Sequence, residues 1–180
     1  MINSVTITDL STAVSSSFKE GRENVWISVV DEADQKKIRM MKRNFSKRQI
    51  PHFAQYFYDW SDEDDDSYIQ KNIEELGPRE QHVNNIISFL QPIVESDKVY
   101  NLGVNCFAGV SRSTAIGIIG WSMQGKIPQE ALDQIIKVRP MAWPNLRILR
   151  FASDILRIDL VNPVKEWKKL NNDGIYTGGW

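Results

Sequence analysis

The segment from Lys98 to Gln124 constrains the fold of this chain more than any other. Residues 98–104 are mostly apolar and are typical of a buried strand, whereas residues 113–124 are rich in Ala and Ile and favour a buried helix. Only a short loop separates the two. A strand and a helix that are both buried need a sheet covered on both faces, so this segment predicts an α/β fold.

The rest of the chain fits an early run of strands and a helical second half. Strands are predicted where apolar residues cluster or alternate, over residues 5–10, 25–30 and 53–58. Helices are predicted over residues 11–20 and 32–44, from Gly77-Pro78 onward, from Pro128 onward and over residues 145–160. We therefore expect one domain over residues 1–162, with a small mixed, largely parallel central sheet flanked by helices. Residues 163–180 show little periodicity and are expected to form an irregular tail.

The composition excludes several classes of protein. The formal net charge is −1, so no overall charge attracts nucleic acid or anionic lipid. The chain has no apolar run of the roughly 18 residues that span a membrane. Its single cysteine cannot form an intramolecular disulfide, which favours a reducing cytoplasm. With two histidines and one cysteine a zinc site is not expected, and we predict a cytoplasmic monomer without metal or cofactor.

Two charged runs are interpreted as solvent-exposed segments. Residues 36–42 are basic and predict the solvated face of a helix, whereas residues 59–66 are acidic and predict a loop. Aspartates alternate in the acidic run, as they do in a calcium-binding EF-hand loop. However, Ser67 and Ile73 stand where that loop requires glycine and glutamate, so a calcium site is excluded.

The loop between the buried strand and the buried helix carries a thiol and a guanidinium, Cys106 and Arg112. Backbone N–H groups of such a loop converge at the N-terminus of the following helix and form an anion-binding site. Arg112 can hold two phosphate oxygens with its planar fork. A cysteine at a helix N-terminus beside arginine loses its proton more readily than a free thiol does. The segment therefore predicts a cysteine nucleophile beneath a bound phosphate.

Neighbouring residues strengthen this interpretation. Gly109 has no Cβ where the loop must turn tightly, and the hydroxyl of Ser113 lies just past the arginine, where it can stabilise sulfur as a leaving group. The alternative is a buried structural cysteine at the end of a strand. Buried cysteines are common, but that alternative leaves Arg112 at the head of an apolar helix unexplained.

The segment from Cys106 to Ser113 resembles the phosphate-binding loop of the cysteine-dependent protein tyrosine phosphatases, in their compact dual-specificity branch. Ser111–Ala115 and Arg139–Asn145 resemble short bacterial members of that group. The resemblance implies a small mixed sheet flanked by helices. It also implies a phosphate site formed by Phe107, Ala108, Gly109, Val110, Ser111 and Arg112, with Cys106, Arg112 and Ser113 in catalysis.

The same resemblance implies a general acid on a loop that follows a strand. Asp59 directly follows the predicted strand at Tyr58 and is the first choice, with Asp62 as the second. The chain departs from the family in one place: Asn105 stands where histidine usually precedes the nucleophile. Asparagine can still donate hydrogen bonds, so we expect the Cys106 thiol to ionise with altered ease, without loss of activity.

The predicted function is hydrolysis of phosphoprotein monoesters, phosphotyrosine first, with phosphoserine or phosphothreonine also open. The loop contains no lysine, which a site for multiply charged inositol phosphates is expected to carry. Two alternatives stay open at this point. One is a phosphatase of nucleotide, RNA 5′ or inositol phosphates, and the other is an inactive module that only binds phosphate.

Overall fold

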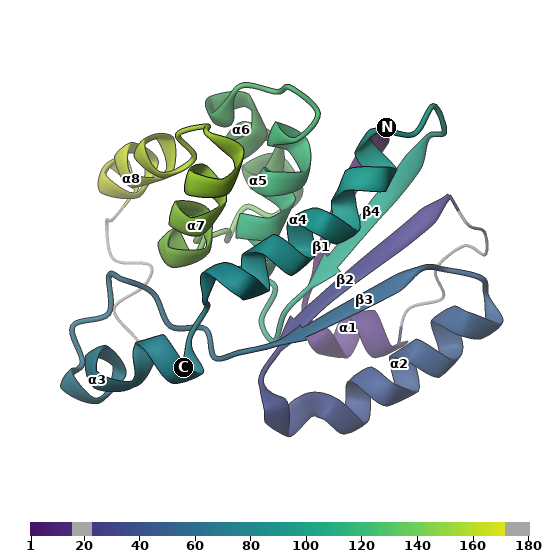
Figure 1. Ribbon diagram of the computed structural model, residues 1–180, viewed down its shortest axis with the longest axis horizontal. Coiled ribbons are helices and arrows are strands. Elements are labelled where there is room, and N and C mark those ends of the chain that lie inside the picture. Colours follow the sequence, from purple (N-terminus) through teal and green to yellow (C-terminus); the bar gives the residue numbers. More distant parts are fainter. Residues whose placement is uncertain (16–22, 172–180) are drawn as a thin grey trace.

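The computed structural model describes residues 1–15 and 23–171, which form an α/β fold around a four-stranded sheet. All four described strands are parallel, in the order β1-β4-β2-β3. Their bounds are Ile2–Thr8 (β1), Asn24–Val30 (β2), His52–Tyr56 (β3) and Tyr100–Asn105 (β4) (Figure 1). The expected α/β class is confirmed, and the sheet is parallel throughout the described part of the chain.

The register of the strands brings several chain segments to one edge of the sheet. Asn105 at the end of β4 pairs with Thr8 of β1 and Ser28 of β2, so the carboxyl ends of these strands lie side by side. In parallel α/β sheets, ligands bind outside the carboxyl ends of the strands. The segments that follow the strands therefore meet where such a ligand would lie.

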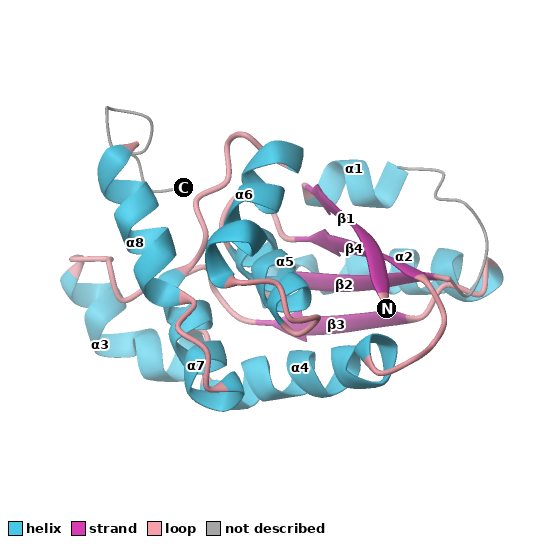
Figure 2. Ribbon diagram, turned by 90° about the horizontal axis from the view of Figure 1, so that it is seen from above, coloured by secondary structure: helices cyan, strands magenta, loops and turns pink. Residues whose placement is uncertain are grey.

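Helices cover both faces of this sheet. On one face lie α1 (Leu10–Ser15) and α2 (Gln35–Lys47), which follows a short 3-10 turn over Glu32–Asp34. The helices on the other face are α4 (Glu80–Val94), α5 (Arg112–Ser122), α6 (Pro128–Val138) and α7 (Leu146–Leu156) (Figure 2). The last described helix, α8 (Val161–Leu170), packs on α6 and α7. None of the described helices is long and apolar enough to span a membrane.

The central helix α5 is buried along most of its length, as the Ala- and Ile-rich sequence predicts. Ala115, Ile116, Ile118 and Ile119 have no exposed surface and pack against the sheet. Burial of one such aliphatic side chain contributes about 1.5–3 kcal/mol, so α5 is anchored firmly. Its first residue is Arg112, and the anchored helix therefore holds the guanidinium in a defined place.

Two segments differ from the prediction. Helix α3 (Ser67–Leu76) follows the acidic run and was not expected, because only Ile73 of this helix is buried. The Asp66 carboxylate accepts hydrogen bonds from the N–H groups of Tyr68 and Ile69 and thereby caps its start.

The second difference concerns the expected irregular tail, residues 163–180. Helix α8 occupies this tail as far as Leu170, so the prediction is wrong there, and residues 172–180 lie outside the described part. The helix is held by buried Val164 and by Lys168, whose ammonium group pairs with Glu63 and lies 4.9 Å from the ring centroid of Trp143. The helix predicted over residues 11–20 is described only as α1, because residues 16–22 lie outside the described ranges.

Candidate active site

The Cys106–Arg112 loop lies between β4 and α5 and turns its carbonyl groups outward, where other parts of the protein donate to them. The carbonyl of Phe107 accepts from the N–H of Leu10, and that of Val110 accepts from the N–H of Trp143. The guanidinium of Arg139 donates to the carbonyls of Ala108 and Gly109, at 2.9 Å in each case. The carbonyl of Ser111 accepts from the N–H groups of Ala115 and Asn145.

This arrangement leaves the N–H groups of the loop available. Within the described part of the chain, the N–H groups of Phe107, Ala108, Val110 and Ser111 donate no backbone or side-chain hydrogen bond. Carbonyls that are all held on the outside of a tight loop leave the N–H groups to converge on its inside. The loop therefore has the backbone geometry that binds an anion.

Gly109 is required by this loop geometry. Its φ angle is +70°, which favours glycine, and a Cβ here would lie 2.6 Å from the carbonyl carbon of Thr8. The loop therefore packs directly against the backbone that follows β1. A side chain at position 109 would push the loop away from its support.

Cys106 is buried and its sulfur has two polar neighbours. The N–H of Gly109 donates to Sγ at 3.2 Å, and the hydroxyl of Ser113 lies 3.3 Å from Sγ. Both contacts stabilise negative charge on sulfur when the groups donate hydrogen. The structure thus brings together Cys106, Gly109 and Ser113, as the sequence predicts.

Arg112 is held beside this sulfur by groups from two other strand ends. One Nη donates to the Asp31 carboxylate and to the carbonyl of Phe57, both at 2.6 Å. Burial lowers the pKa of the guanidinium, but the negative charges of Asp59, Cys106 and Asp31 outweigh it and hold the pKa above its usual value. The buried Nε has no hydrogen-bond partner and lies 3.6 Å from the Asp59 carboxylate. The guanidinium of Arg112 therefore keeps N–H groups available to donate hydrogen bonds to a bound oxyanion.

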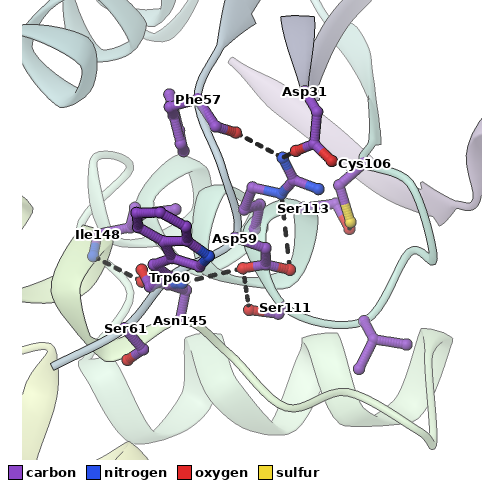
Figure 3. A network of polar contacts seen from close by, with 12 residues as sticks. Asp31, Phe57, Asp59, Trp60, Ser61, Cys106, Ser111, Ser113, Asn145 and Ile148 are labelled. Atoms are coloured by element: carbon purple, nitrogen blue, oxygen red, sulfur yellow. Dashed lines mark hydrogen bonds and ion pairs between the residues drawn. The ribbon is translucent and has the colours of Figure 1, made fainter. Parts of the chain in front are cut away.

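Asp59 lies at the mouth of the same loop (Figure 3). Its carboxylate accepts from the Ser111 hydroxyl at 2.7 Å and from the Asn145 amide at 3.0 Å. The side chain is 32% exposed, so its carboxylate is accessible from solvent. Asp59 is thus positioned within reach of a phosphate held by the loop.

Asp62, the second choice for the acid, points elsewhere. Its carboxylate pairs with Arg147 at 2.7 Å and with Arg150 at 2.8 Å, both on α7. Burial raises the pKa of Asp62, but the hydrogen bonds from Arg150 and Arg147 outweigh it and place the pKa below its usual value. A carboxylate held ionised in an ion-pair network is poorly suited to donate a proton, so the geometry favours Asp59.

Asn105, in the place of the family's usual histidine, is part of a buried polar network. Its side-chain oxygen accepts from the Trp26 indole and from the Ser28 hydroxyl, at 2.7 Å each. Ser28 in turn lies 2.9 Å from Nε2 of His52. Because the indole N–H can only donate, the amide oxygen must face Trp26. Asn105, the residue before Cys106, is therefore tied to both β2 and β3.

Three residues that support the site were not identified individually from the sequence. Asp31 contacts Arg112, and Asn145 contacts Asp59. Arg139 donates hydrogen bonds to carbonyls of the loop. For Arg139 and Asn145 the signal was their place in the segment 139–145 that resembles the bacterial phosphatases. For Asp31 the only signal was an acidic residue directly after a buried strand.

Comparison with known proteins identifies the fold. No family model and no curated protein matches the chain. The solved structure of Tk-PTP in its active form matches with 13% identity and a TM-score of 0.54, over 86% of this chain and 92% of that one. A mutant form of Tk-PTP matches with 14% identity and a TM-score of 0.51, over 93% of each chain. PTPMT1 matches with 14% identity and a TM-score of 0.50, over 95% of this chain and 96% of that one.

These structural relatives are cysteine-dependent phosphatases of the protein tyrosine phosphatase superfamily. At such low identities the likeness establishes the shared fold, and the chain has a protein tyrosine phosphatase-like fold. The fold predicted from the resemblance is therefore confirmed.

Proposed function

We propose that this protein hydrolyses phosphate monoesters through a cysteinyl-phosphate intermediate. The observation that carries the proposal is the Cys106–Arg112 loop. Each carbonyl from Phe107 to Ser111 accepts a hydrogen bond from another part of the protein, and the buried Nε of Arg112 has no hydrogen-bond partner. The sulfur of Cys106 lies beside the N–H of Gly109 and the hydroxyl of Ser113, which can stabilise a thiolate. A loop that only bound phosphate would not require a thiol at its centre.

In the first step the Cys106 thiolate attacks phosphorus, so that an S–P bond forms and the P–O bond to the leaving group breaks. The loop N–H groups and Arg112 stabilise the charge on the transferring phosphoryl oxygens. Asp59, protonated before the step, donates its proton to the leaving oxygen. The hydrogen bonds from Ser111 and Asn145 hold the carboxyl of Asp59 in place.

In the second step water attacks phosphorus and the S–P bond breaks. Asp59, now ionised, accepts a proton from that water and returns to its starting state. The sulfur leaves as a thiolate, stabilised by the hydroxyl of Ser113 at 3.3 Å and the N–H of Gly109 at 3.2 Å. The cycle consumes one water and releases inorganic phosphate and an alcohol or phenol.

Phosphotyrosine in a protein is the substrate that the mouth of the site favours. Phe107 directly follows the nucleophile and is 53% exposed, so it offers an aromatic surface to the ring of a bound phosphotyrosine. The loop has no lysine that would hold a second phosphate of an inositol phosphate or a nucleotide. A thiol nucleophile suits the reducing cytoplasm, where we propose that the protein acts as a monomer.

The test is turnover of a phosphotyrosine peptide alongside phosphoserine peptides, inositol phosphates, nucleotides and 5′-phosphorylated RNA. We expect the phosphotyrosine peptide to have the highest kcat/KM. Cys106→Ser should abolish turnover but still bind vanadate, because the loop N–H groups and Arg112 remain. Turnover by Cys106→Ser within tenfold of the wild type would refute the mechanism, and a higher kcat/KM on another substrate would refute the substrate class.

A further inference from the structure

The exposed side of α2 carries a row of cations that the proposed chemistry does not use. Positions i, i+4, i+7 and i+11 of a helix lie roughly in line, and here they hold Lys36, Met40, Arg43 and Lys47. The helix contains no acidic residue, and all its cations are exposed, namely Lys36, Lys37, Arg39, Lys42, Arg43 and Lys47. Lys36, Arg43 and Lys47 form no ion pair with the described residues.

This row begins at the mouth of the candidate active site. The Asp31–Arg112 ion pair ties the segment just before α2 to the catalytic loop. Within the first turns of α2, the ammonium group of Lys37 lies 6.0 Å from the ring centroid of Phe107, the exposed residue after the nucleophile. A substrate chain that leaves the loop over Phe107 therefore reaches the basic side of α2 directly.

The other side of the mouth has the opposite charge. Asp59 is the first residue of the acidic run 59–66, in which Asp65 and Asp66 are exposed, and this run leads into α3. Figure 1 shows α3 to the left of the carboxyl ends of the strands and the start of α2 below them. A polypeptide with acidic residues is thus attracted toward α2 and repelled from α3, which gives it one preferred direction across the site.

We propose that the Lys36–Lys47 row binds an acidic segment that flanks the phosphotyrosine of the substrate, an inference that rests on the proposed function. The 13 residues of α2 span about 20 Å at 1.5 Å per residue. An extended peptide advances about 3.3 Å per residue, so about six flanking residues can lie along the row. The substrate class is therefore a phosphotyrosine protein with several Asp or Glu residues on one side of the tyrosine.

An acidic polypeptide fits this surface better than a lipid membrane or RNA does. A helix that lies on a membrane inserts its apolar face into the lipid, but the apolar face of α2, with Ile38, Met41 and Phe45, is buried against the sheet. Surfaces for single-stranded RNA interleave cations with aromatic rings that stack on bases, and α2 exposes no aromatic residue. The single exposed apolar residue of the row is Met40.

The experiment compares two phosphotyrosine peptides at low ionic strength, one with a six-residue Asp/Glu flank and one with the matching Asn/Gln flank. Each pair is made with the flank before and after the tyrosine. The wild type should prefer the acidic peptide about tenfold in kcat/KM for one of the two directions, through a lower KM. High salt should remove the preference, because the row is exposed.

The variant Arg43→Glu/Lys47→Glu should lose the preference, since it reverses two charges far from the loop. The control Lys98→Glu/Lys165→Glu changes the net charge equally on other faces and should keep the preference. Equal kcat/KM for both peptides in an active wild-type enzyme would overturn this inference alone, as would salt-sensitive binding of α2 to anionic vesicles or RNA without a peptide preference. Absence of aryl phosphate turnover by the wild type would instead overturn the proposed function.

Discussion

Arg139 should be the residue outside the catalytic loop on which the shape of that loop depends most. Its guanidinium donates to the carbonyls of Ala108 and Gly109, each at 2.9 Å, and so holds the middle of the loop with two charge-assisted bonds. Such a bond contributes about 1.5–3 kcal/mol, and the lower value applies here because Arg139 is partly exposed. The variant Arg139→Met should therefore destabilise the folded conformation of the loop by about 3 kcal/mol.

Loss of that energy should be seen in catalysis as well as in stability. If the loop N–H groups converge only while Arg139 holds the carbonyls, kcat/KM should fall about 100-fold, since 1.4 kcal/mol corresponds to a factor of ten. Vanadate binding should weaken by a similar factor. Arg139→Lys should recover little of the loss, because an ammonium group cannot bridge the two carbonyls as the planar fork does.

The control for this measurement is Arg150→Met, which removes an exposed arginine from the Asp62 ion pairs on α7. It should leave kcat/KM and vanadate binding unchanged. Steady-state kinetics, vanadate titration and thermal unfolding of both variants complete the assay. An Arg139→Met enzyme with a lowered Tm but wild-type kcat/KM would refute the reasoning, because the contact would then be merely structural.

The proposed general acid Asp59 and the buried polar network beside Cys106 yield two further predictions. Asp59→Asn should lower kcat by about 10²–10⁴ on phenyl phosphate and by less on p-nitrophenyl phosphate, whose leaving group needs less protonation. Asp62→Asn should leave the ratio of kcat on the two substrates as in the wild type. The reverse pattern would assign the acid to Asp62. Burial, with a smaller contribution from Lys42, lowers the pKa of His52 from 6.5 to about 4. Between these two pH values the folded protein keeps His52 neutral, whereas the unfolded chain takes up a proton. Stability should therefore fall by up to about 3 kcal/mol as the pH drops from 6.5 to 4, and urea titrations of His52→Gln should show a shallower fall; an equal slope would contradict this contribution.

The local part of the site could be predicted from the sequence. A buried strand, a short loop and a buried helix are contiguous in the chain, so their geometry follows from short-range patterns around Cys106 and Arg112. Gly109 and Ser113 belong to the same segment, and their places beside the sulfur follow from it. The α/β class followed from the same alternation of buried strands and helices.

Weakly patterned helices could not be predicted in the same way. Helix α3 buries only Ile73, and α8 buries Val164 together with a lysine, so neither shows a strong apolar stripe. Lys168 can be buried only because Glu63 and the ring of Trp143, both distant in sequence, surround its ammonium group. The stability of such helices comes from tertiary contacts, which a single sequence does not reveal.

Sequence patterns were enough to predict that Cys106, Arg112 and the loop between them lie together, because residues within one strand–loop–helix unit are held together by local backbone geometry. Which distant groups complete the site depends instead on the folded chain. Asp31 reaches Arg112 across 81 positions of the chain, and Arg139 reaches Gly109 across 30. The parallel register of the sheet sets the first of these contacts, since it brings the carboxyl ends of separate strands to one edge. The packing of α6 against α5 sets the second, and both depend on contacts throughout the core.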